Sequence, residues 1–176
     1  DYPYTREKWL RAEKRKAAMI TRLDDAVGQI MFKLKQYNME QDTVIFFTSD
    51  NGPHQEGGND PAFFKSAGPF RGIKGSLHEG GLRVPMIVRW TGKVKANSVS
   101  EQAFPFWDVM PTILQIARIP PPREIDGISL LPTLIGLPQK QQHDYLYWES
   151  HENGTQQAIR MGKWKFIRPS LIEDGG

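Results

Sequence analysis

Cysteine is absent from the 176 residues of this sequence. Disulfide bonds, thiolate metal ligands and a cysteine nucleophile are therefore excluded within the chain. Long apolar runs are missing too, and no stretch approaches the roughly 20 residues that a membrane-spanning helix needs, so we expect no membrane span. The lack of cysteine leaves the compartment open, because proteins without it occur on both sides of a membrane.

A large net charge is also missing. Lys and Arg number 23 against 20 Asp and Glu, which gives a formal net charge of +3. These charges are interspersed and form no dense basic stripe, so we expect no nucleic-acid partner. The hydrophobic share of 39% is typical of a globular chain. The length suffices for one ordinary domain with its own core.

The first half of the sequence has the pattern of an α/β protein. Residues 7–36 carry apolar side chains three and four positions apart, which predicts an amphipathic helix that packs on another element and stops at Asn38. The β-prone run 43–48 lacks polar alternation, as in a strand buried on both faces of a parallel sheet. A glycine-rich segment, 52–82, separates it from a second apolar strand, 84–90, and loops of that length are commonly functional.

The second half changes character along its length. A helix is predicted over 104–119 and a weakly helical connector over 130–137. Three short strands follow, at 145–148, 157–160 and 163–167, with Met161-Gly162 as the tight turn between the last two. We therefore divide the chain into an α/β part, 1–138, and a small antiparallel β part, 139–176.

Asp50 and Asn51 stand directly after the first predicted strand. Ligands collect at the carboxyl ends of strands in open α/β sheets, where the loops diverge. A carboxylate beside an amide carbonyl supplies two hard oxygen ligands suited to Ca²⁺ or Mg²⁺. The same residues also favour an ordinary turn, so spacing alone leaves both interpretations open.

Lys74 lies between glycines in the motif Arg71-Gly-Ile-Lys-Gly-Ser76. Small neighbours allow its ammonium to approach a tetrahedral oxyanion such as sulfate or phosphate. The glycine spacing is not that of a P-loop, and a solvated loop lysine is the alternative interpretation. The four histidines, His54, His78, His143 and His151, are too scattered to indicate a zinc site.

Three motifs occur in a fixed order: Thr48-Ser-Asp-Asn-Gly52, the glycine loop around Lys74, and Glu79-Gly-Gly-Leu-Arg-Val-Pro85. Together they resemble the carboxyl-terminal half of a type I, formylglycine-dependent sulfatase (the arylsulfatase family). The ordered set is far more specific than any single motif. Further matches lie along nearly the whole chain, at Ala17-Ala-Met-Ile20, Asp108-Val-Met-Pro-Thr112, Asp126-Gly127 and the segment 158–165.

The resemblance implies a fold and a set of site residues. The fold is an alkaline-phosphatase-like α/β sheet flanked by helices, present in part, with a small C-terminal antiparallel sheet. Asp50 and Asn51 match two ligands of the active-site calcium. Lys74 matches the catalytic lysine that contacts the sulfate group and stabilises charge as the ester bond breaks. His54 follows the metal strand, and we expect it to bind substrate.

The family's nucleophile is a formylglycine made in a Cys/Ser-x-Pro/Ala-x-Arg signature, which this sequence lacks. The resemblance places it, and further calcium ligands, upstream of Asp1. The chain is thus interpreted as a fragment of a sulfatase, inactive alone, whose whole form hydrolyses sulfate esters of sulfated carbohydrates. A periplasmic or secreted location is a family expectation only. Glu79 and Arg83 are interpreted as an ion pair that holds the lysine loop.

Two other functions stay open at this point. One is a phosphate or phosphonate ester hydrolase of the same superfamily, and the other is a non-catalytic scaffold that binds a glycan or a partner chain. Tyr145, Trp148 and Trp164 form either a sugar-stacking wall or part of the core of the small sheet. The fragment interpretation also predicts that strands 44–47 and 84–88 pair with strands that the chain does not contain, which leaves an open hydrophobic edge or face.

Overall fold

The computed structural model describes residues 3–151 and 155–169. Its first long element is the helix α1, Arg11–Gln36, which follows a short 3-10 turn, η1, at Tyr4–Arg6. The predicted start at residue 7 is wrong, because the backbone N–H of Glu7 bonds back to the carbonyl of Tyr4 and closes that turn. The predicted stop at Asn38 is confirmed. Asn38 has a φ of 57°, the left-handed conformation that ends many helices.

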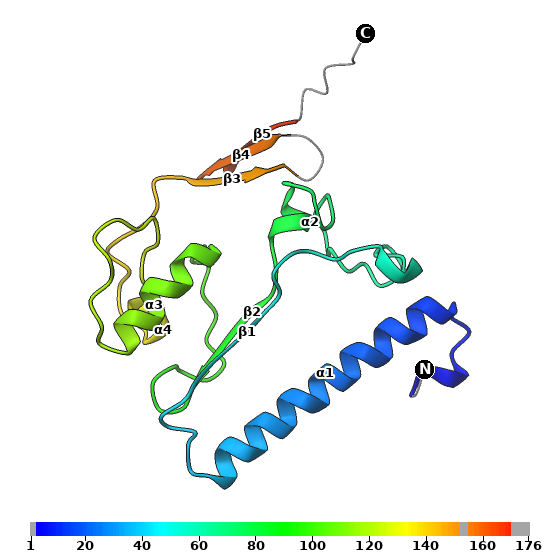
Figure 1. The fold of residues 1–176 in the computed structure, drawn as a ribbon, viewed down its shortest axis with the longest axis horizontal. Coiled ribbons are helices and arrows are strands. Elements are labelled where there is room, and N and C mark those ends of the chain that lie inside the picture. The colour runs from blue at the N-terminus through cyan, green and yellow to red at the C-terminus, as the bar shows by residue number, and fades with distance from the viewer. Residues whose placement is uncertain (1–2, 152–154, 170–176) are drawn as a thin grey trace.

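The helix α1 packs on the rest of the chain mainly near its N-terminal end (Figure 1). There the Glu13 carboxylate accepts a hydrogen bond from the Asp60 backbone N–H at 2.6 Å, and Lys16 donates to Asn59 at 3.1 Å. The prediction of a packed apolar face is only half confirmed. Ala18 is buried, but many apolar side chains of the helix are exposed: Met19, Ile20, Leu23, Ile30 and Phe32.

Two strands, β1 (Val44–Thr48) and β2 (Met86–Trp90), form an antiparallel pair, with Val44 opposite Trp90 and Thr48 opposite Met86. The expectation of a parallel sheet is therefore wrong for this pair, whereas the outer edge of each strand has no partner within the described residues and pairing there with strands outside the chain stays a prediction. Apolar strands without alternation carry no signal of direction, so the sequence did not distinguish the two arrangements. The predicted open hydrophobic face is confirmed, since Phe47 and Ile87 lie opposite each other and are 37% and 61% exposed.

Residues 49–85 leave β1 and return to β2 at the same end of the strand pair. This connection holds two short elements, the 3-10 turn η2 (Glu56–Gly58) and the helix α2 (Glu79–Leu82). Figure 1 shows it folding back so that α2 lies between the strand pair and the C-terminal strands. The predicted glycine-rich loop is thus a connection with internal structure.

After β2 come η3 (Phe106–Asp108), α3 (Val109–Ile116) and α4 (Leu131–Leu134). The helix predicted over 104–119 exists but is shorter. It ends early because Arg118 adopts a left-handed φ of 58°, and the N–H of Ile119 then bonds to the carbonyl of Leu114 at 2.9 Å.

Three antiparallel strands, β3 (Leu146–Ser150), β4 (Gln156–Met161) and β5 (Trp164–Arg168), form the predicted small sheet. The turn between the last two is Gly162-Lys163 and not the predicted Met161-Gly162, because Met161 already pairs with Trp164. Side chains alternate between a covered and an exposed face. None of the helices in residues 3–151 and 155–169 combines the length and low polarity that a bilayer crossing requires.

Candidate active site

Close backbone packing joins the turn after β1 to the lysine loop. The N–H of Gly52 donates to the carbonyl of Gly81 at 2.8 Å, and the N–H of Lys74 donates to the carbonyl of Pro53 at 2.9 Å. A Cβ atom on Gly52 would lie 1.8 Å from the carbonyl oxygen of Gly80, so only glycine fits there. The structure therefore brings the Asp50–Asn51 turn and the Lys74 loop into direct contact.

Asp50 and Asn51 present oxygen atoms at this junction. Asp50 is exposed and Asn51 is half-buried. The Asn51 side chain donates from Nδ2 to the carbonyl of Gly52 at 2.8 Å, which leaves its Oδ1 as an acceptor. Within residues 3–151 and 155–169, no three His, Asp or Glu side chains gather as a metal-binding group. The donors are thus of the right chemistry for a hard cation but are too few to hold one alone.

Lys74 forms an ion pair that the sequence did not predict. Its Nζ lies 2.6 Å from Oε1 of Glu56, and both side chains are substantially exposed. The hydrogen bond from Lys74 and its positive charge lower the pKa of the Glu56 carboxyl. His54 is next to this pair, since its Nδ1 accepts a hydrogen bond from the Glu56 backbone N–H at 3.1 Å. His54, Glu56 and Lys74 therefore form one group at the Asp50–Asn51 turn.

Glu79, the first residue of α2, is contacted by three basic side chains. The predicted partner, Arg83, is present with its Nη1 3.9 Å from Oε2 of Glu79. Two residues of the C-terminal sheet also reach this carboxylate. The Nζ of Lys165 lies 2.7 Å from Oε1, and Nη1 of Arg160 lies 3.8 Å from Oε2. The closest partner of Glu79 thus comes from β5, far away in sequence.

His78 precedes α2 and is partly buried. Its Nδ1 lies 3.0 Å from the hydroxyl oxygen of Ser76. Burial lowers the pKa of His78, and the positive charges of Arg71 and Lys165 lower that pKa further. The imidazole is therefore neutral at neutral pH. The sequence had left the role of His78 open, and the structure places it at the junction of the lysine loop and the C-terminal sheet.

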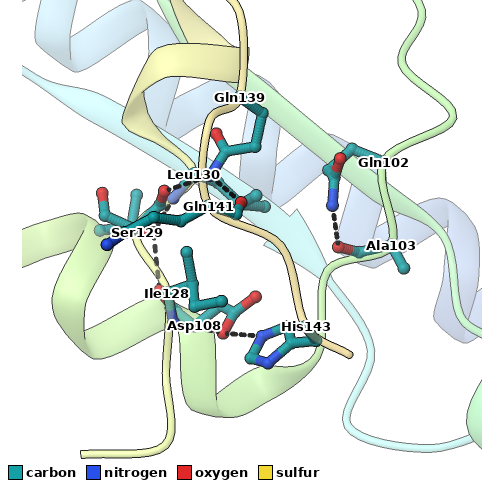
Figure 2. A network of polar contacts seen from close by, with 10 residues as sticks. Gln102, Ala103, Asp108, Ile128, Ser129, Leu130, Gln139, Gln141 and His143 are labelled. Atoms are coloured by element: carbon teal, nitrogen blue, oxygen red, sulfur yellow. Dashed lines mark hydrogen bonds and ion pairs between the residues drawn. The ribbon is translucent and has the colours of Figure 1, made fainter. Parts of the chain in front are cut away.

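A second polar cluster surrounds Asp108, whose side chain is 1% exposed (Figure 2). One carboxylate oxygen accepts hydrogen bonds from the Ile128 backbone N–H at 2.8 Å and from Nε2 of His143 at 2.8 Å. Burial is the largest effect on the carboxyl and raises the pKa of Asp108 despite these hydrogen bonds. The contact between His143 and Asp108 connects the segment before β3 to the start of α3. None of these residues belongs to the lysine loop.

Of the two alternatives for Tyr145, Trp148 and Trp164, a shared sugar-stacking wall is not formed, because the three side chains do not lie on one face. Trp148 lies opposite Ala158, which lies opposite Ile167, so these three share one face of the sheet. Trp164 lies three positions before Ile167 on β5, and side chains an odd number of positions apart on a strand lie on opposite faces. Trp164 is therefore on the other face of the sheet, where it is 64% exposed. Trp148 instead packs against Trp107 with ring centroids 5.8 Å apart. Tyr145 lies outside the strands and is exposed.

Comparison with protein families yields two matches. The model described as Sulfatase matches residues 2–119. The model described as N-sulphoglucosamine sulphohydrolase, C-terminal, matches residues 73–171 and overlaps the first.

Individual relatives agree with this result. The chain is 35% identical to steryl-sulfatase of Mus musculus over 145 residues, which are 80% of this chain and 23% of that protein. It is 34% identical to N-acetylgalactosamine-6-sulfatase of Canis lupus familiaris over 154 residues, 83% of this chain and 27% of that protein. The chain therefore spans about a quarter of the length of the curated relatives it matches.

A solved structure resembles the fold. The crystal structure of Ps i-CgsB in complex with k-i-k-neocarrahexaose matches with a TM-score of 0.80 and 29% identity, covering 92% of this chain and 35% of that chain. The fold class expected from the motifs is thereby confirmed as part of an alkaline-phosphatase-like α/β architecture.

Proposed function

Because the chain belongs to the sulfatase family, we propose that the whole protein hydrolyses sulfate esters of carbohydrates. The observation that carries this proposal is the packing of the Lys74 loop against the Asp50–Asn51 turn. This packing supports the proposal because a cation bound at the turn and the ammonium of the loop would both favour the binding of a sulfate anion.

A carbohydrate substrate is supported by the names of the relatives. One matched relative is an N-acetylgalactosamine-6-sulfatase, and one matched structure holds a neocarrahexaose. We propose a sulfated saccharide on that basis. A steryl-sulfatase is also among the relatives, so the sulfate ester is the better supported part of the substrate.

The donors at the Asp50–Asn51 turn fit a calcium ion in chemistry. The Asp50 carboxylate and Oδ1 of Asn51 would contribute two oxygen ligands, and the remaining ligands would come from outside the described residues. When bound, the calcium ion supplies positive charge against the sulfate group. We propose a formylglycine nucleophile upstream of Asp1, as the family implies.

The chain's own side chains then have distinct tasks. Lys74 donates hydrogen bonds to a sulfate oxygen and stabilises the negative charge that develops on the ester. His54, beside the partner of Lys74, contacts the substrate. We also propose that residues 1–138 belong to the catalytic α/β domain and that 139–176 begin a C-terminal subdomain, of which 152–154 and 170–176 lie outside the described residues.

The test uses the whole protein with p-nitrophenyl sulfate, p-nitrophenyl phosphate and a 6-sulfated N-acetylgalactosamine. We expect turnover of the sulfate esters and a loss of about 100-fold or more in kcat for Lys74→Ala, because removal of one charge-stabilising donor costs about that much. Lys93→Ala, a change of an exposed turn lysine, should leave kcat unchanged. Faster turnover of the phosphate ester than of both sulfate esters would overturn the proposal.

Calcium binding is measured separately from activity. We expect elemental analysis to find less bound calcium in Asp50→Ala than in the parent protein, and titration calorimetry to find weaker binding. The same calcium content in both would remove Asp50 from the ligand set. Saccharide binding without calcium, unaffected by Asp50→Ala, would instead favour a non-catalytic scaffold.

A further inference from the structure

The small C-terminal sheet is connected directly to the lysine loop. Lys165 of β5 donates from Nζ to Oε1 of Glu79 at 2.7 Å, across 86 residues of sequence. Its side chain is 13% exposed and that of Glu79 is 29% exposed. A partly buried ion pair of this kind is less screened by solvent than a surface pair. The contact thus joins this sheet to α2, together with that of Arg160 of β4, whose Nη1 lies 3.8 Å from Oε2 of Glu79.

Glu79 is rigidly joined to the backbone that carries Lys74. The N–H of Gly80 donates to the carbonyl of Arg71 at 2.8 Å, at the start of the lysine loop. A Cβ on Gly81 would lie 2.1 Å from the carbonyl oxygen of Ser76 and 2.6 Å from that of Ile73. These approaches leave no space between α2 and the residues on both sides of Lys74, so a movement of α2 moves the loop with it.

Lys165 is itself held in place on the sheet. Its Nζ lies 5.0 Å from the centroid of the Trp148 ring, a cation–π contact. Trp148 in turn packs on Trp107, which immediately precedes the buried Asp108. The sheet therefore presents a fixed ammonium to α2, in contrast to Lys163, whose side chain lies over the exposed Trp164 ring in the turn.

We propose that Lys165 is a positioning residue, which holds Glu79 and α2 so that Lys74 stays at the Asp50–Asn51 turn. The proposal rests on the proposed function, because it assigns Lys165 an effect on the catalytic lysine. Lys165 does not contact substrate in this scheme. It acts through Glu79 and the glycine-packed backbone, and the C-terminal sheet is then a functional part of the catalytic unit.

The first experiment measures kcat and KM of the whole protein for a sulfate ester after Lys165→Met. We expect kcat to fall about tenfold or more, since displacement of a catalytic group by about 1 Å costs up to 100-fold. Lys165→Arg should recover most of the loss, because it keeps the charge. Lys163→Met, the matched control two residues away, should leave kcat within about twofold, as expected for a surface change.

A second readout separates positioning from simple loss of folded protein. In a Lys74→Arg background, Lys165→Met should cause no further fall in kcat, because the group that it positions is already altered. If Lys165→Met reduced kcat by the same factor in both backgrounds, Lys165 would act only on the fraction of folded protein, and the proposal would be overturned. An unchanged kcat for Lys165→Met in the parent background would overturn it as well.

Hydrogen–deuterium exchange tests the proposal without any activity. We expect Lys165→Met to speed exchange in peptides covering 71–82 and to leave those of α3 unchanged. Faster exchange throughout the chain, or no change at 71–82, would contradict the coupling. If the parent protein hydrolyses no sulfate ester, the proposed function fails, whereas the exchange result still decides whether Lys165 holds the loop.

Discussion

The Nζ atom of Lys74 lies 2.6 Å from Oε1 of Glu56, a residue 18 positions earlier in the same glycine-rich connection. The carboxylate of Glu56 thus neutralises the charge of the Lys74 ammonium, the group that we propose contacts the sulfate. Glu56 is exposed and its pKa is lowered by Lys74, so it is ionised at neutral pH. Under the proposed function, a sulfate ester therefore competes with a carboxylate for this lysine.

Glu56→Gln should lower KM for a sulfate ester by at most about fivefold, because exposed ion pairs of this type contribute little free energy. The substitution removes a negative charge that repels the substrate and keeps the side-chain shape. Steady-state kinetics on the whole protein checks this, with Glu124→Gln, a change of an exposed glutamate, as the control. A rise in KM would mean that Glu56 assists substrate binding.

Asp108→Ala should lower the free energy of unfolding by about 2 kcal/mol or more, since a buried group that loses its partner costs about 1–3 kcal/mol. The substitution leaves both the Ile128 N–H and the His143 imidazole without their acceptor. Denaturant unfolding measures the loss. Asp144→Ala, at an exposed neighbouring aspartate, should change stability by less than about 0.5 kcal/mol.

The free energy of unfolding should depend on pH through the titration of the Asp108 carboxyl. Because its pKa is raised in the folded state, folding favours the protonated carboxyl. This contribution is fully present below the pKa of the unfolded chain, about 3.9, and is lost as pH rises through the higher folded value. The free energy of unfolding of the parent minus that of Asp108→Asn should therefore fall from about pH 4 upward. A difference that increases with pH would show that the folded pKa is depressed.

Thr112→Val should destabilise the protein by about 1–3 kcal/mol, the cost of a buried donor without an acceptor. The Thr112 hydroxyl, at 0% exposure, donates to the Asp108 carbonyl at 2.6 Å and accepts from the Leu130 N–H at 2.9 Å. Valine has nearly the same shape but no hydroxyl. Thr112→Ser keeps the hydroxyl, and a thermal melt should place it above the valine variant. The opposite order would mean that packing outweighs the hydrogen bonds.

Gly52→Ala and Gly28→Ala should have opposite effects on stability. A Cβ at Gly52 meets the Gly80 carbonyl at 1.8 Å, so the loops must separate, at a cost of about 2 kcal/mol or more. Gly28 lies within α1 with nothing within 4 Å of a Cβ, and alanine there should stabilise the helix by up to about 1 kcal/mol. Chemical denaturation of both variants is the measurement. Equal stabilities would refute the backbone contact.

The sulfate-ester activity of the Gly52→Ala variant should fall as well, and that of Gly28→Ala should not. Separation of the loops moves Lys74 away from the Asp50–Asn51 turn, and small displacements of catalytic groups lower rates strongly. An active Gly52→Ala variant would show that the two loops need not touch for catalysis.

Local features of the fold could be predicted from the sequence, because they depend on neighbouring residues. The period of α1, the stop at Asn38 and the alternation in the C-terminal strands are of this kind. The direction of β2 relative to β1 was not predictable, since both runs are largely apolar and show no regular alternation. The direction of the second strand depends on the path of the segment that connects the two strands. A glycine-rich segment has no regular pattern from which this path can be predicted.

Motifs indicate the candidate site residues, whereas contacts between residues far apart in the sequence could not be predicted. Asp50, Asn51 and Lys74 stand out by residue type and glycine neighbours. The pair of Glu79 with Lys165 joins residues 86 positions apart, and that of Asp108 with His143 joins residues 35 positions apart. Charged residues such as Lys165 are common on any surface, so nothing local distinguishes this lysine from Lys163.

The pairing of Thr48 with Met86 has a practical consequence for protein engineering. Residues 49–85 begin and end at neighbouring positions, so the segment can be exchanged with little effect on the closure entropy, which changes by only about 0.6 kcal/mol per doubling of length. The contacts of Gly52 with Gly80 and Gly81 lie wholly within it. A graft between Thr48 and Met86 would therefore transfer the turn and the lysine loop as one piece, and the recipient would have to match the contacts that Lys165 and Glu13 make with this segment.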